Sequence, residues 1–544
     1  MSRRQVSNEA LAIIFQIAVV ALAFSGTRGA DSLAVYPAPG DQLKSDKYRV
    51  RVSQDSKVHN SFVYVSRPPE GVIHIRPVVG RTMSWTTVSS RGPLSVEVTK
   101  LFGQPAKEVV FSPGRSAKLL KQLDGHTVRF VINEPCYVSV NFLCEDNTAE
   151  FGQIRHGLMI FYDPPERDPP KPSDAGVVAY GPQVSLKSLG QAKVIYFAPG
   201  IHNLLDDKRM SPSGVANIRA EQTVYIAGGA FVYGCIDGRA DVGTKVLGRG
   251  VLSGANYIHL SAADKSPKME RPLGGLIAFS AYDRKAKRGC PRGECKQVVS
   301  GITLVDPTFH AMQIGGKAQV DHVKLMTWHV NEDGYRCGKG GIFQDCFIQA
   351  TDDHFYCHPI TIQRCVFWPR WNGAVLQFGW RDLPTGGTQL SDCDVINPEW
   401  SGRGANVGIL NSQLATTAKC GDVVIENLRI EGQIAALVNL HHSTNSEATL
   451  HDKEPGHIRN VMLRNVTLDR PQYWHRQARL NNTTGPGRSL IKGTKLNSGK
   501  TAFISNITFE NLKIDGEWIT EKNYSKHFEI DPETTKDIRF LVTQ

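Results

Sequence analysis

The stretch ITLVDP (302–307) returns along the chain as VKLMTW (323–328), CFIQAT (346–351) and CVFWPR (365–370), at intervals of 21, 23 and 19 residues. With longer insertions between them, four more copies follow: CDVINP from Cys393, LRIEGQ from Leu428, VTLDRP from Val466 and LKIDGE from Leu512. Each copy is one short strand of alternating apolar residues. A coil of about 20 residues cannot bury its inward face alone, so such coils stack on one another. We therefore predict a right-handed parallel β-helix over residues 177–544.

The sequence before this region has a different pattern. Residues 31–161 contain short alternating segments such as KYRVRVSQ (47–54), SFVYVSR (61–67) and CYVSVNFL (136–143), with turn residues between them. This pattern predicts an antiparallel β-sandwich domain. The stretch YDPPERDPPKPSDAG (162–176) contains five prolines and predicts a stiff linker between the two domains. The predicted fold class is therefore all-β.

The first 25 residues have the features of a secretory signal peptide. SRR at positions 2–4 precedes an apolar stretch at 11–24, and small residues follow. This segment is short for a membrane span, although an uncleaved anchor is the alternative. No later stretch reaches membrane-spanning length, so we expect a secreted extracellular or periplasmic protein without an integral span after cleavage.

The net charge limits the classes of binding partner that we expect, and the cysteine spacing indicates what the cysteines do. The chain has 544 residues, 21% of them charged, and a formal net charge of +11, which serves solubility or favours an anionic glycan. Export and the absence of a recognisable motif argue against nucleic acid. Eleven cysteines leave at least one unpaired, and Cys290 and Cys295 in CPRGEC predict a disulfide. Cys346, Cys365 and Cys393 share one place in the repeat, which predicts buried apolar positions and no metal site.

Two adjacent carboxylates interrupt an apolar run in ATDDHFYCH (350–358). Like charges this close repel, so one of Asp352 and Asp353 is pushed toward protonation. Asp333, in HVNEDGY, precedes them by 19 and 20 residues, which is one coil. Equivalent positions of neighbouring coils lie about 4.8 Å apart, so we expect all three carboxylates to meet.

The alternatives for this cluster are a calcium site, a strained turn and an acid/base site. Calcium prefers further oxygen ligands, and no run of alternating acidic residues supplies them. In acid/base catalysis one carboxyl with a raised pKa donates a proton while the others activate water. We therefore expect a catalytic site without metal or other cofactor. Four nearby aromatic residues could stack on sugar rings or pack in the core: Tyr356, Trp368, Trp371 and Trp380.

The segment WHVNEDGY…TDDHFYCHPITIQRCVFWPRWNGAVLQFGWRDL (328–383) resembles glycoside hydrolase family 49, the dextranases and isopullulanase, and more distantly the polygalacturonases of the same clan. The order of β-sandwich and β-helix is similar too. The resemblance implies that Asp352 is the general acid and that Asp333 and Asp353 hold and deprotonate the water. It also implies substrate contacts, which we assign to Asn331, Tyr356, Trp371, Gln377 and Trp380.

The chain departs from this family at two points. Family members usually carry a lysine three residues beyond the second Asp of the pair, where this sequence has Tyr356. The Gly-His-Gly and Arg-x-Lys signatures of polygalacturonases are absent, which argues against a galacturonan substrate. We therefore predict a monomeric, inverting, endo-acting hydrolase of a dextran-like or pullulan-like α-glucan. A hydrolase of another, anionic polysaccharide and a non-catalytic glycan-binding β-helix are the alternatives.

Overall fold

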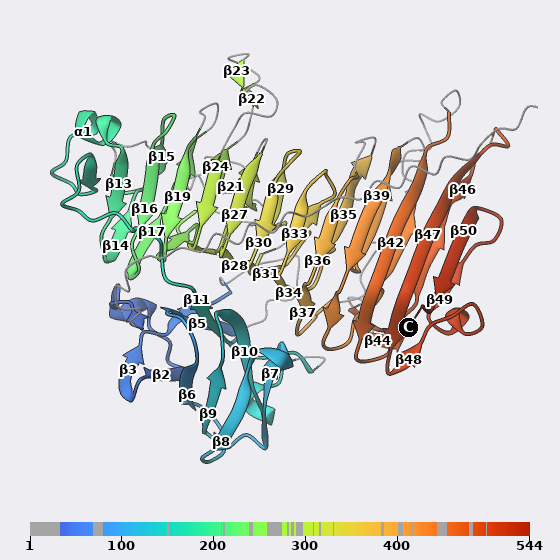
Figure 1. Cartoon of the computed structure of the whole chain (residues 1–544), viewed down its shortest axis with the longest axis horizontal. Helices are drawn as coiled ribbons and strands as arrows, with labels where there is room; N and C mark the ends of the chain where they lie inside the picture. The colour runs from blue at the N-terminus through green and yellow to red at the C-terminus, as the bar shows by residue number, and fades with distance from the viewer. Residues whose placement is uncertain are drawn as a thin grey trace, which may run out of the picture.

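The computed structural model describes residues 33–68, 80–149, 152–207, 209, 213–238, 243–257, 275–279, 282–283, 288–289, 297–307, 309–314, 317–329, 331–381, 386–400, 406–414, 418–442, 454–477, 482–496 and 498–543. Two small sheets precede a long solenoid of parallel strands (Figure 1). The predicted signal peptide and the predicted Cys290–Cys295 pair lie outside the described residues. The predicted fold class, a β-sandwich followed by a parallel β-helix, is confirmed.

The sandwich consists of a six-stranded and a five-stranded sheet. The strands of the first sheet are β1 (Ala34–Val35), β4 (Tyr64–Ser66), β5 (Thr82–Ser89), β7 (Glu108–Ser112), β10 (Cys136–Leu143) and β11 (His156–Asp163). Those of the second are β2 (Tyr48–Gln54), β3 (Lys57–Ser61), β6 (Leu94–Lys100), β8 (Lys118–Gln122) and β9 (Thr127–Ile132). Short 3-10 turns lie at Asp41–Leu43, Gly114–Ser116 and Glu145–Asn147.

The prediction of a purely antiparallel sandwich is wrong at one pair of strands. β5 and β11 run parallel, with His156 opposite Thr82 and Asp163 opposite Ser89. Every residue of both strands is buried. One face packs inside the sandwich, and the other carries Trp85 and Phe161 against the solenoid. Apolar alternation reveals which residues are buried but not the direction of the neighbouring strand.

Each coil of the solenoid contributes strands to three rows. Row a comprises β12 (Val177–Ala179), β13 (Val194–Phe197), β16 (Thr223–Ile226), β19 (Lys245–Gly248), β24 (Gln297–Ser300), β27 (Ala318–Asp321), β30 (Ile342–Gln344), β33 (Thr361–Gln363), β36 (Gln389–Ser391), β39 (Lys419–Glu426), β42 (His457–Leu468), β47 (Thr501–Ile514) and β50 (Thr535–Leu541). Row b comprises β14 (Gly200–Asn203), β17 (Ala230–Tyr233), β20 (Val251–Ser253), β25 (Thr303–Val305), β28 (Lys324–Met326), β31 (Phe347–Ala350), β34 (Val366–Pro369), β37 (Asp394–Val395) and β40 (Arg429–Ile430), and β42 and β47 continue into it.

Row c forms a separate sheet of eleven strands. They are β15 (Val215–Asn217), β18 (Cys235–Asp237), β21 (Gly275–Phe279), β26 (His310–Ile314), β29 (Tyr335–Cys337), β32 (Phe355–Tyr356), β35 (Leu376–Arg381), β38 (Leu410–Leu414), β41 (Val438–His441), β45 (Ser489–Lys492) and β49 (Phe528–Ile530). Strands outside the rows are β22 (Tyr282–Asp283), β23 (Arg288–Gly289), β43 (Tyr473–Gln477), β44 (Asn482–Pro486), β46 (Thr494–Lys495) and β48 (Glu517–Trp518).

The repeat seen in the sequence corresponds to the turn from row a into row b. Thr303 pairs with Lys324, which pairs with Phe347, which pairs with Val366. The residue before each repeat takes a left-handed conformation. Its φ is 79° at Gly301, before the first repeat, and between 52° and 55° at the other seven: His322, Asp345, Arg364, Asp392, Asn427, Asn465 and Asn511. Asp and Asn adopt this conformation more readily than most residues, and they hold most of these turns.

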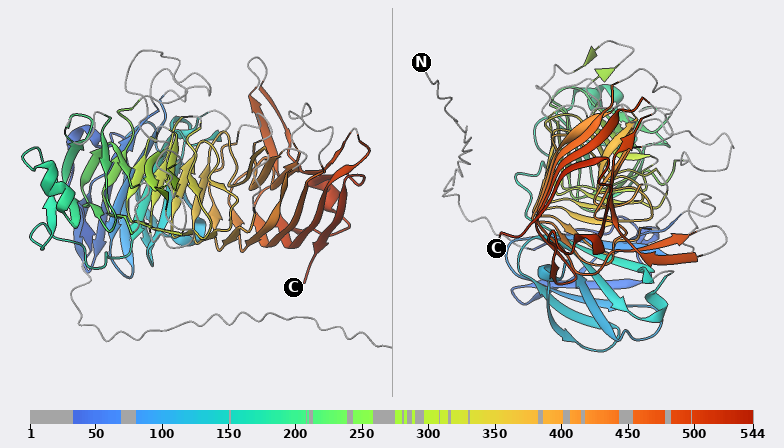
Figure 2. Two further views of the ribbon diagram at one scale, coloured as in Figure 1. Left: turned by 90° about the horizontal axis from the view of Figure 1, so that it is seen from above. Right: turned by 90° about the vertical axis from the view of Figure 1, so that its right-hand side faces the viewer.

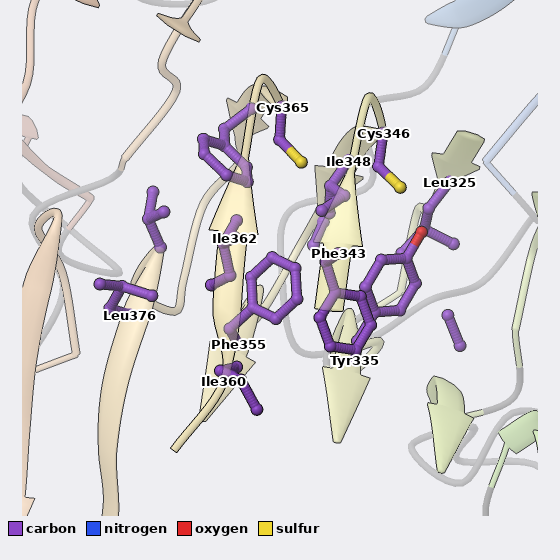
Figure 3. Close-up of a cluster of buried hydrophobic side chains, with 14 of the residues drawn as sticks. Leu325, Tyr335, Phe343, Cys346, Ile348, Phe355, Ile360, Ile362, Cys365 and Leu376 are labelled. Carbon is purple, nitrogen blue, oxygen red and sulfur yellow. The ribbon is translucent and has the colours of Figure 1, made fainter. Parts of the chain in front are cut away.

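The solenoid interior is a continuous apolar stack, part of which Figure 3 shows. Phe343, Ile348 and Phe355 from neighbouring strands pack there on one another. Cys346, Cys365 and Cys393 are fully buried at equivalent turns, as predicted. Each thiol contacts the backbone carbonyl two residues before it, at 3.1 to 3.4 Å. These cysteines therefore act as small interior residues.

The first coil is covered by the short helix α1 (Leu186–Gln191), which begins after its N-cap Ser185. Leu189 is buried against the core, and Gln222 donates hydrogen bonds to the carbonyls of Leu189 and Ala192. A 3-10 turn at Tyr524–Lys526 lies near the other end. The longest axis of the molecule runs along the direction in which the coils stack, as the view from above shows (Figure 2). In the described part of the chain, no helix is long and apolar enough to cross a membrane.

The sandwich lies along row b of the solenoid (Figures 1 and 2). Its Trp85, Met159 and Phe161 form one buried cluster with Phe347 and Trp368 of row b. β11 ends at Asp163 and β12 begins at Val177, with the proline-rich segment between them. That the two parts are separate folding domains remains a prediction.

Buried ion pairs also cross this interface. Lys324 of row b is fully buried and pairs with Asp163 of β11. Arg249 contacts the same carboxylate at 3.3 Å, and the Tyr137 hydroxyl donates to it at 2.7 Å. Burial favours the neutral acid, yet the charges of Lys324 and Arg249 lower the pKa of Asp163. Since an unpaired buried charge is costly, these contacts fix the sandwich at one position along the coils.

Candidate active site

Three carboxylates lie together where the coils enter row c. Asp333 precedes β29 by two residues and Asp353 precedes β32 by two, and Tyr335 pairs with Phe355. The backbone N–H of Gly334 donates to the Asp353 carbonyl at 2.8 Å, and that of His354 donates to the Ala374 carbonyl at 2.8 Å. Position 353 therefore stacks on position 333, which is the register that the 20-residue spacing predicts, and the next step of 21 residues places position 374 on 353.

Asp333 is 4% exposed, and its oxygen Oδ2 contacts two side chains from neighbouring coils. The Tyr356 hydroxyl donates to Oδ2 at 2.6 Å. His310 Nδ1 lies 3.1 Å from the same oxygen. His310 begins β26 and is the register equivalent of Asp333 one coil earlier, since Met312 pairs with Tyr335. Asp333 is thus held from the coil before it and the coil after it.

Asp352 is surrounded by amide donors. Asn372 donates to Oδ2 at 2.9 Å, and the backbone N–H of Asp353 donates to Oδ1 at 2.9 Å. The side chain of Asn406 lies 3.4 Å from Oδ1, and the backbone of Asn331 also hydrogen-bonds this carboxyl. Burial, followed by the charge of Asp333, nevertheless raises the pKa of Asp352 to about 7. Asp352 can therefore carry a proton near neutral pH.

Asp353 is the most deeply buried acid of the cluster, at 1% exposure. Its Oδ1 accepts a hydrogen bond from the backbone N–H of Ala374 at 2.9 Å. Burial, and then the charges of Asp352 and Asp333, raise the pKa of Asp353 well above its usual range. A negative charge on Asp352 or Asp333 therefore opposes ionisation of Asp353.

Glycine allows the acid pair to approach the following coil. Gly373 has φ +81°, and a Cβ there would lie 2.1 Å from the backbone carbon of Asp352 and 2.3 Å from the nitrogen of Asp353. A Cβ on Gly334 would lie 2.3 Å from the carbonyl oxygen of His354. Any larger residue at these places must therefore displace the backbone that carries the acids.

We expect Gly373→Ala to lower hydrolytic activity by about tenfold or more, because small displacements of reacting groups are costly. Gly499→Ala is the matched control, since Gly499 also has φ +81° but a Cβ there would meet nothing within 4 Å. Both variants carry the same backbone strain, and only the first shifts the acids. Activity per folded molecule, with folding checked by circular dichroism, separates the two effects. Equal losses in the two variants would contradict the positional argument.

The residues predicted to contact substrate differ in their surroundings in the structure. Asn331 is exposed beside the acids, and Tyr356 lies at the cluster. Gln377 is fully buried and accepts a hydrogen bond from Asn411 of the next coil at 2.7 Å. Trp380 lies in β35 after a register shift, and its side chain is outside the described residues. Gln377 therefore belongs to a ladder of side chains along row c.

The burial of Trp368 and Trp371 favours the alternative of packing over sugar stacking, and the assignment of Trp371 to substrate stays a prediction. Trp368 is fully buried, and its Nε1 donates to Glu399 at 3.0 Å. Trp371 is 6% exposed, and the guanidinium of Arg370 lies 4.4 Å from its ring centroid. Both rings belong to the cluster shared with the sandwich. They face outward from the coil, and the sandwich covers the surface that they would otherwise present.

Three residues of the site are absent from the sequence-based assignment: His310, Asn372 and Asn406. The coil register could have found two of them. His310 precedes Asp333 by one coil, and Asn372 follows Asp352 by one coil of 20 residues. Asn406 comes after a longer insertion, so its position in the sequence gives no such signal.

A separate cavity of about 390 Å³ lies between the sandwich and the turns into row b. None of the three acids lines it. Its arginines pair with neighbouring carboxylates, as in the contact of Arg364 with Asp345 at 2.8 Å and that of Arg429 with Asp394 at 2.6 Å. In the described part of the chain, no group of three or more His, Cys, Asp or Glu is arranged to hold a metal ion.

Comparisons with known proteins point to one enzyme class. No family model matches the chain. A dextranase of Arthrobacter globiformis is 25% identical over 556 residues, covering 89% of this chain and 83% of that protein. A dextranase of Talaromyces minioluteus is 22% identical, covering 89% and 86%. The solved structure of Dex49A from Penicillium minioluteum matches with a TM-score of 0.72 at 17% identity, covering 94% of this chain and 99% of that chain. The predicted resemblance to dextranases is therefore confirmed, and the fold is shared.

Proposed function

We propose that this chain is a dextranase-like glycoside hydrolase that cleaves an α-glucan within the polymer and inverts the configuration at the anomeric carbon. The meeting of Asp333, Asp352 and Asp353 from neighbouring coils is the observation that carries the proposal. A binding protein gains nothing from three crowded carboxyls, whereas hydrolysis requires one protonated and one ionised carboxyl on the same bond. Similarity to dextranases over 89% of the chain supports the α-glucan substrate.

In the proposed mechanism Asp352 is the general acid. Its raised pKa of about 7 keeps a proton available near neutral pH. This proton passes to the glycosidic oxygen as the bond from that oxygen to the anomeric carbon breaks. A water molecule attacks the same carbon from the opposite face and gives its proton to the Asp333 and Asp353 pair. One bond forms, one breaks, and the reaction consumes one water.

We also propose that the chain is exported, because residues 1–25 have the features of a signal peptide and a polymer substrate lies outside the cell. A monomer suffices for this reaction, since all three acids belong to one chain. Gel filtration with light scattering tests the monomer directly.

Hydrolysis of dextran, pullulan and polygalacturonate, followed by reducing-sugar release, tests the substrate class. We expect activity on dextran or pullulan, with a rapid fall in polymer size as internal bonds break. Activity on polygalacturonate alone would favour the anionic alternative. Tight binding of all three polymers without hydrolysis would favour a binding protein.

The configuration of the first product tests the mechanism. Carboxyl separations of roughly 6.5–9.5 Å leave room for the water of a single displacement, against about 5–5.5 Å for a covalent intermediate. We expect an α-linked substrate to release a β-configured reducing end first. Proton NMR of the anomeric signal in the first minutes, before mutarotation, measures this. Initial release of the α-anomer would mean that one of the three aspartates is a nucleophile.

A further inference from the structure

Two side chains from the coils on either side of Asp333 converge on a single oxygen of its carboxylate. The Tyr356 hydroxyl lies 2.6 Å from Oδ2, and His310 Nδ1 lies 3.1 Å from it. The rings of His310 and Tyr356 are 6.1 Å apart between centroids and inclined at 76°. His310 is 3% exposed, so this arrangement is shielded from bulk water.

We propose that His310 and Tyr356 are positioning residues that hold Asp333 as the water-activating carboxylate, by engaging Oδ2 and leaving Oδ1 for the water. The inference rests on the proposed hydrolytic function and divides the work among the three acids. It also changes the sequence-based assignment of Tyr356 from substrate contact to support of the base.

The donors around the three acids differ in a way that favours Asp333 as the base. A hydrogen bond to a carboxylate stabilises the ionised form, and a second polar group against the same oxygen also limits its orientation. Oδ2 of Asp333 accepts a hydrogen bond from the phenol of Tyr356, which can remain a donor as the carboxylate takes up the proton of the water, and the imidazole of His310 lies against the same oxygen. Asp353 has a backbone amide on Oδ1 and is more deeply buried.

The ring nitrogen facing Asp333 decides which substitutions are informative. Nδ1 is the nitrogen that the side-chain amide of asparagine reproduces most closely, so His310→Asn can keep a polar nitrogen near Oδ2. His310→Leu keeps the approximate size and removes the polar nitrogen. Tyr356→Phe removes one hydroxyl and leaves the ring in place. These three variants therefore separate the polar contacts with Asp333 from the packing.

The experiment compares kcat and KM of these variants with the wild type on the best α-glucan substrate. We expect Tyr356→Phe to lower kcat about 10- to 100-fold, because a hydrogen bond to a charged group is lost. We expect His310→Leu to lower kcat as well, because the polar contact of Nδ1 with Oδ2 of Asp333 is lost. We expect KM to stay within about twofold, since the bonds act on the base and not on substrate affinity. His310→Asn should recover a measurable part of the loss of His310→Leu.

A double-variant cycle tests whether Tyr356 acts through Asp333, because a purely structural role of Tyr356 would lower activity whether or not Asp333 is intact. With Asp333→Asn already present, Tyr356→Phe should cause no further loss, because both changes disable the same base. Tyr162→Phe is the matched control: it removes a buried hydroxyl that donates to the Gly92 carbonyl at 2.6 Å within the sandwich. This control should lower only the melting temperature.

The possible results distinguish a failure of this inference from a failure of the proposed function. A wild-type chain that hydrolyses no α-glucan would overturn the proposed function, and the inference with it. An active wild type with unchanged kcat in Tyr356→Phe and His310→Leu would overturn the inference alone. Additive losses in the Asp333→Asn background, or a rise in KM without a fall in kcat, would assign Tyr356 to the substrate instead.

Discussion

Asp352→Asn is expected to lower the rate of α-glucan hydrolysis by about 10²- to 10⁴-fold, because it removes the proton donor to the leaving group. The oxygen of the substituted amide can still accept from the backbone N–H of Asp353, and its NH2 group can donate to the side-chain oxygen of Asn372 once that amide is turned round; both partners now donate to Asp352 at 2.9 Å. The fold should therefore persist. Initial rates of reducing-sugar release, compared with the wild type at equal concentration of folded protein, measure the loss.

The stability of this variant provides an independent check. Asp352 has its pKa raised from 3.8 to about 7 in the folded protein, so between these values the folded state binds more protons than the unfolded state. Its contribution to stability therefore becomes less favourable as pH rises from about 4 to 7. Asparagine carries no such dependence, so we expect the melting temperature of Asp352→Asn relative to wild type to be higher at pH 8 than at pH 4.

Asp345→Asn is the matched control for activity, because Asp345 is a carboxylate in the same coil that pairs with Arg364 away from the acid cluster. It should keep wild-type turnover. If Asp352→Asn also kept wild-type turnover, the general acid would have to be another residue.

The sequence repeat predicts the fold well because the structure repeats the same local conditions in every coil. One left-handed turn residue, often Asp or Asn, is followed by one buried residue and one alternating strand. This pattern survives insertions, because the insertions lie in loops while the register of Thr303, Lys324, Phe347 and Val366 is kept. Alternation alone did not reveal the parallel pair β5 and β11, whose burial on both faces depends on the solenoid beside them.

The position of the acids follows from the sequence for the same reason, while the sequence does not reveal all of their partners. Spacings of 19 and 20 residues equal one coil, so Asp333, Asp352 and Asp353 had to meet. His310 and Asn372 lie one coil from Asp333 and Asp352, whereas the donor from Asn406 comes across a longer insertion. Trp368 illustrates the other limit: its outward direction is predictable from alternation, but the sandwich that covers it is encoded more than 200 residues earlier.

The acid loops are also attached to the sandwich through one buried carboxylate, Glu399. Arg81 of the sandwich contacts it at 2.6 and 2.9 Å, and Arg370 contacts it at 3.2 Å. Burial favours a neutral acid, but the two guanidiniums lower the pKa of Glu399. Arg370 in turn lies 4.2 Å from the ring centroid of Trp328 and 4.4 Å from that of Trp371, which flank the loops of Asp333 and Asn372.

Glu399→Ala is therefore expected to lower the free energy of unfolding by about 3–5 kcal/mol, because it leaves two guanidiniums buried without their shared partner. Arg81 is 3% exposed, and Arg370 is fully buried, so water cannot replace the carboxylate without opening the interface. Burial already lowers the pKa of Arg370 to about 9 with Glu399 in place. Urea denaturation, followed by tryptophan fluorescence, measures the change.

Glu533→Ala is the matched control, since Glu533 pairs with Lys495 at the same 2.6 Å but on the surface, with 69% of its side chain exposed. Removing that pair should leave the free energy of unfolding almost unchanged, because water screens an exposed ion pair. The combination Arg81→Met, Glu399→Leu and Arg370→Met should recover much of the stability lost in Glu399→Ala, because it removes all three charges together. Equal destabilisation by Glu399→Ala and Glu533→Ala would mean that water reaches the interface and screens these charges. Full stability of Glu399→Ala combined with reduced hydrolysis would mean instead that Glu399 positions the acid loops without holding the sandwich in place.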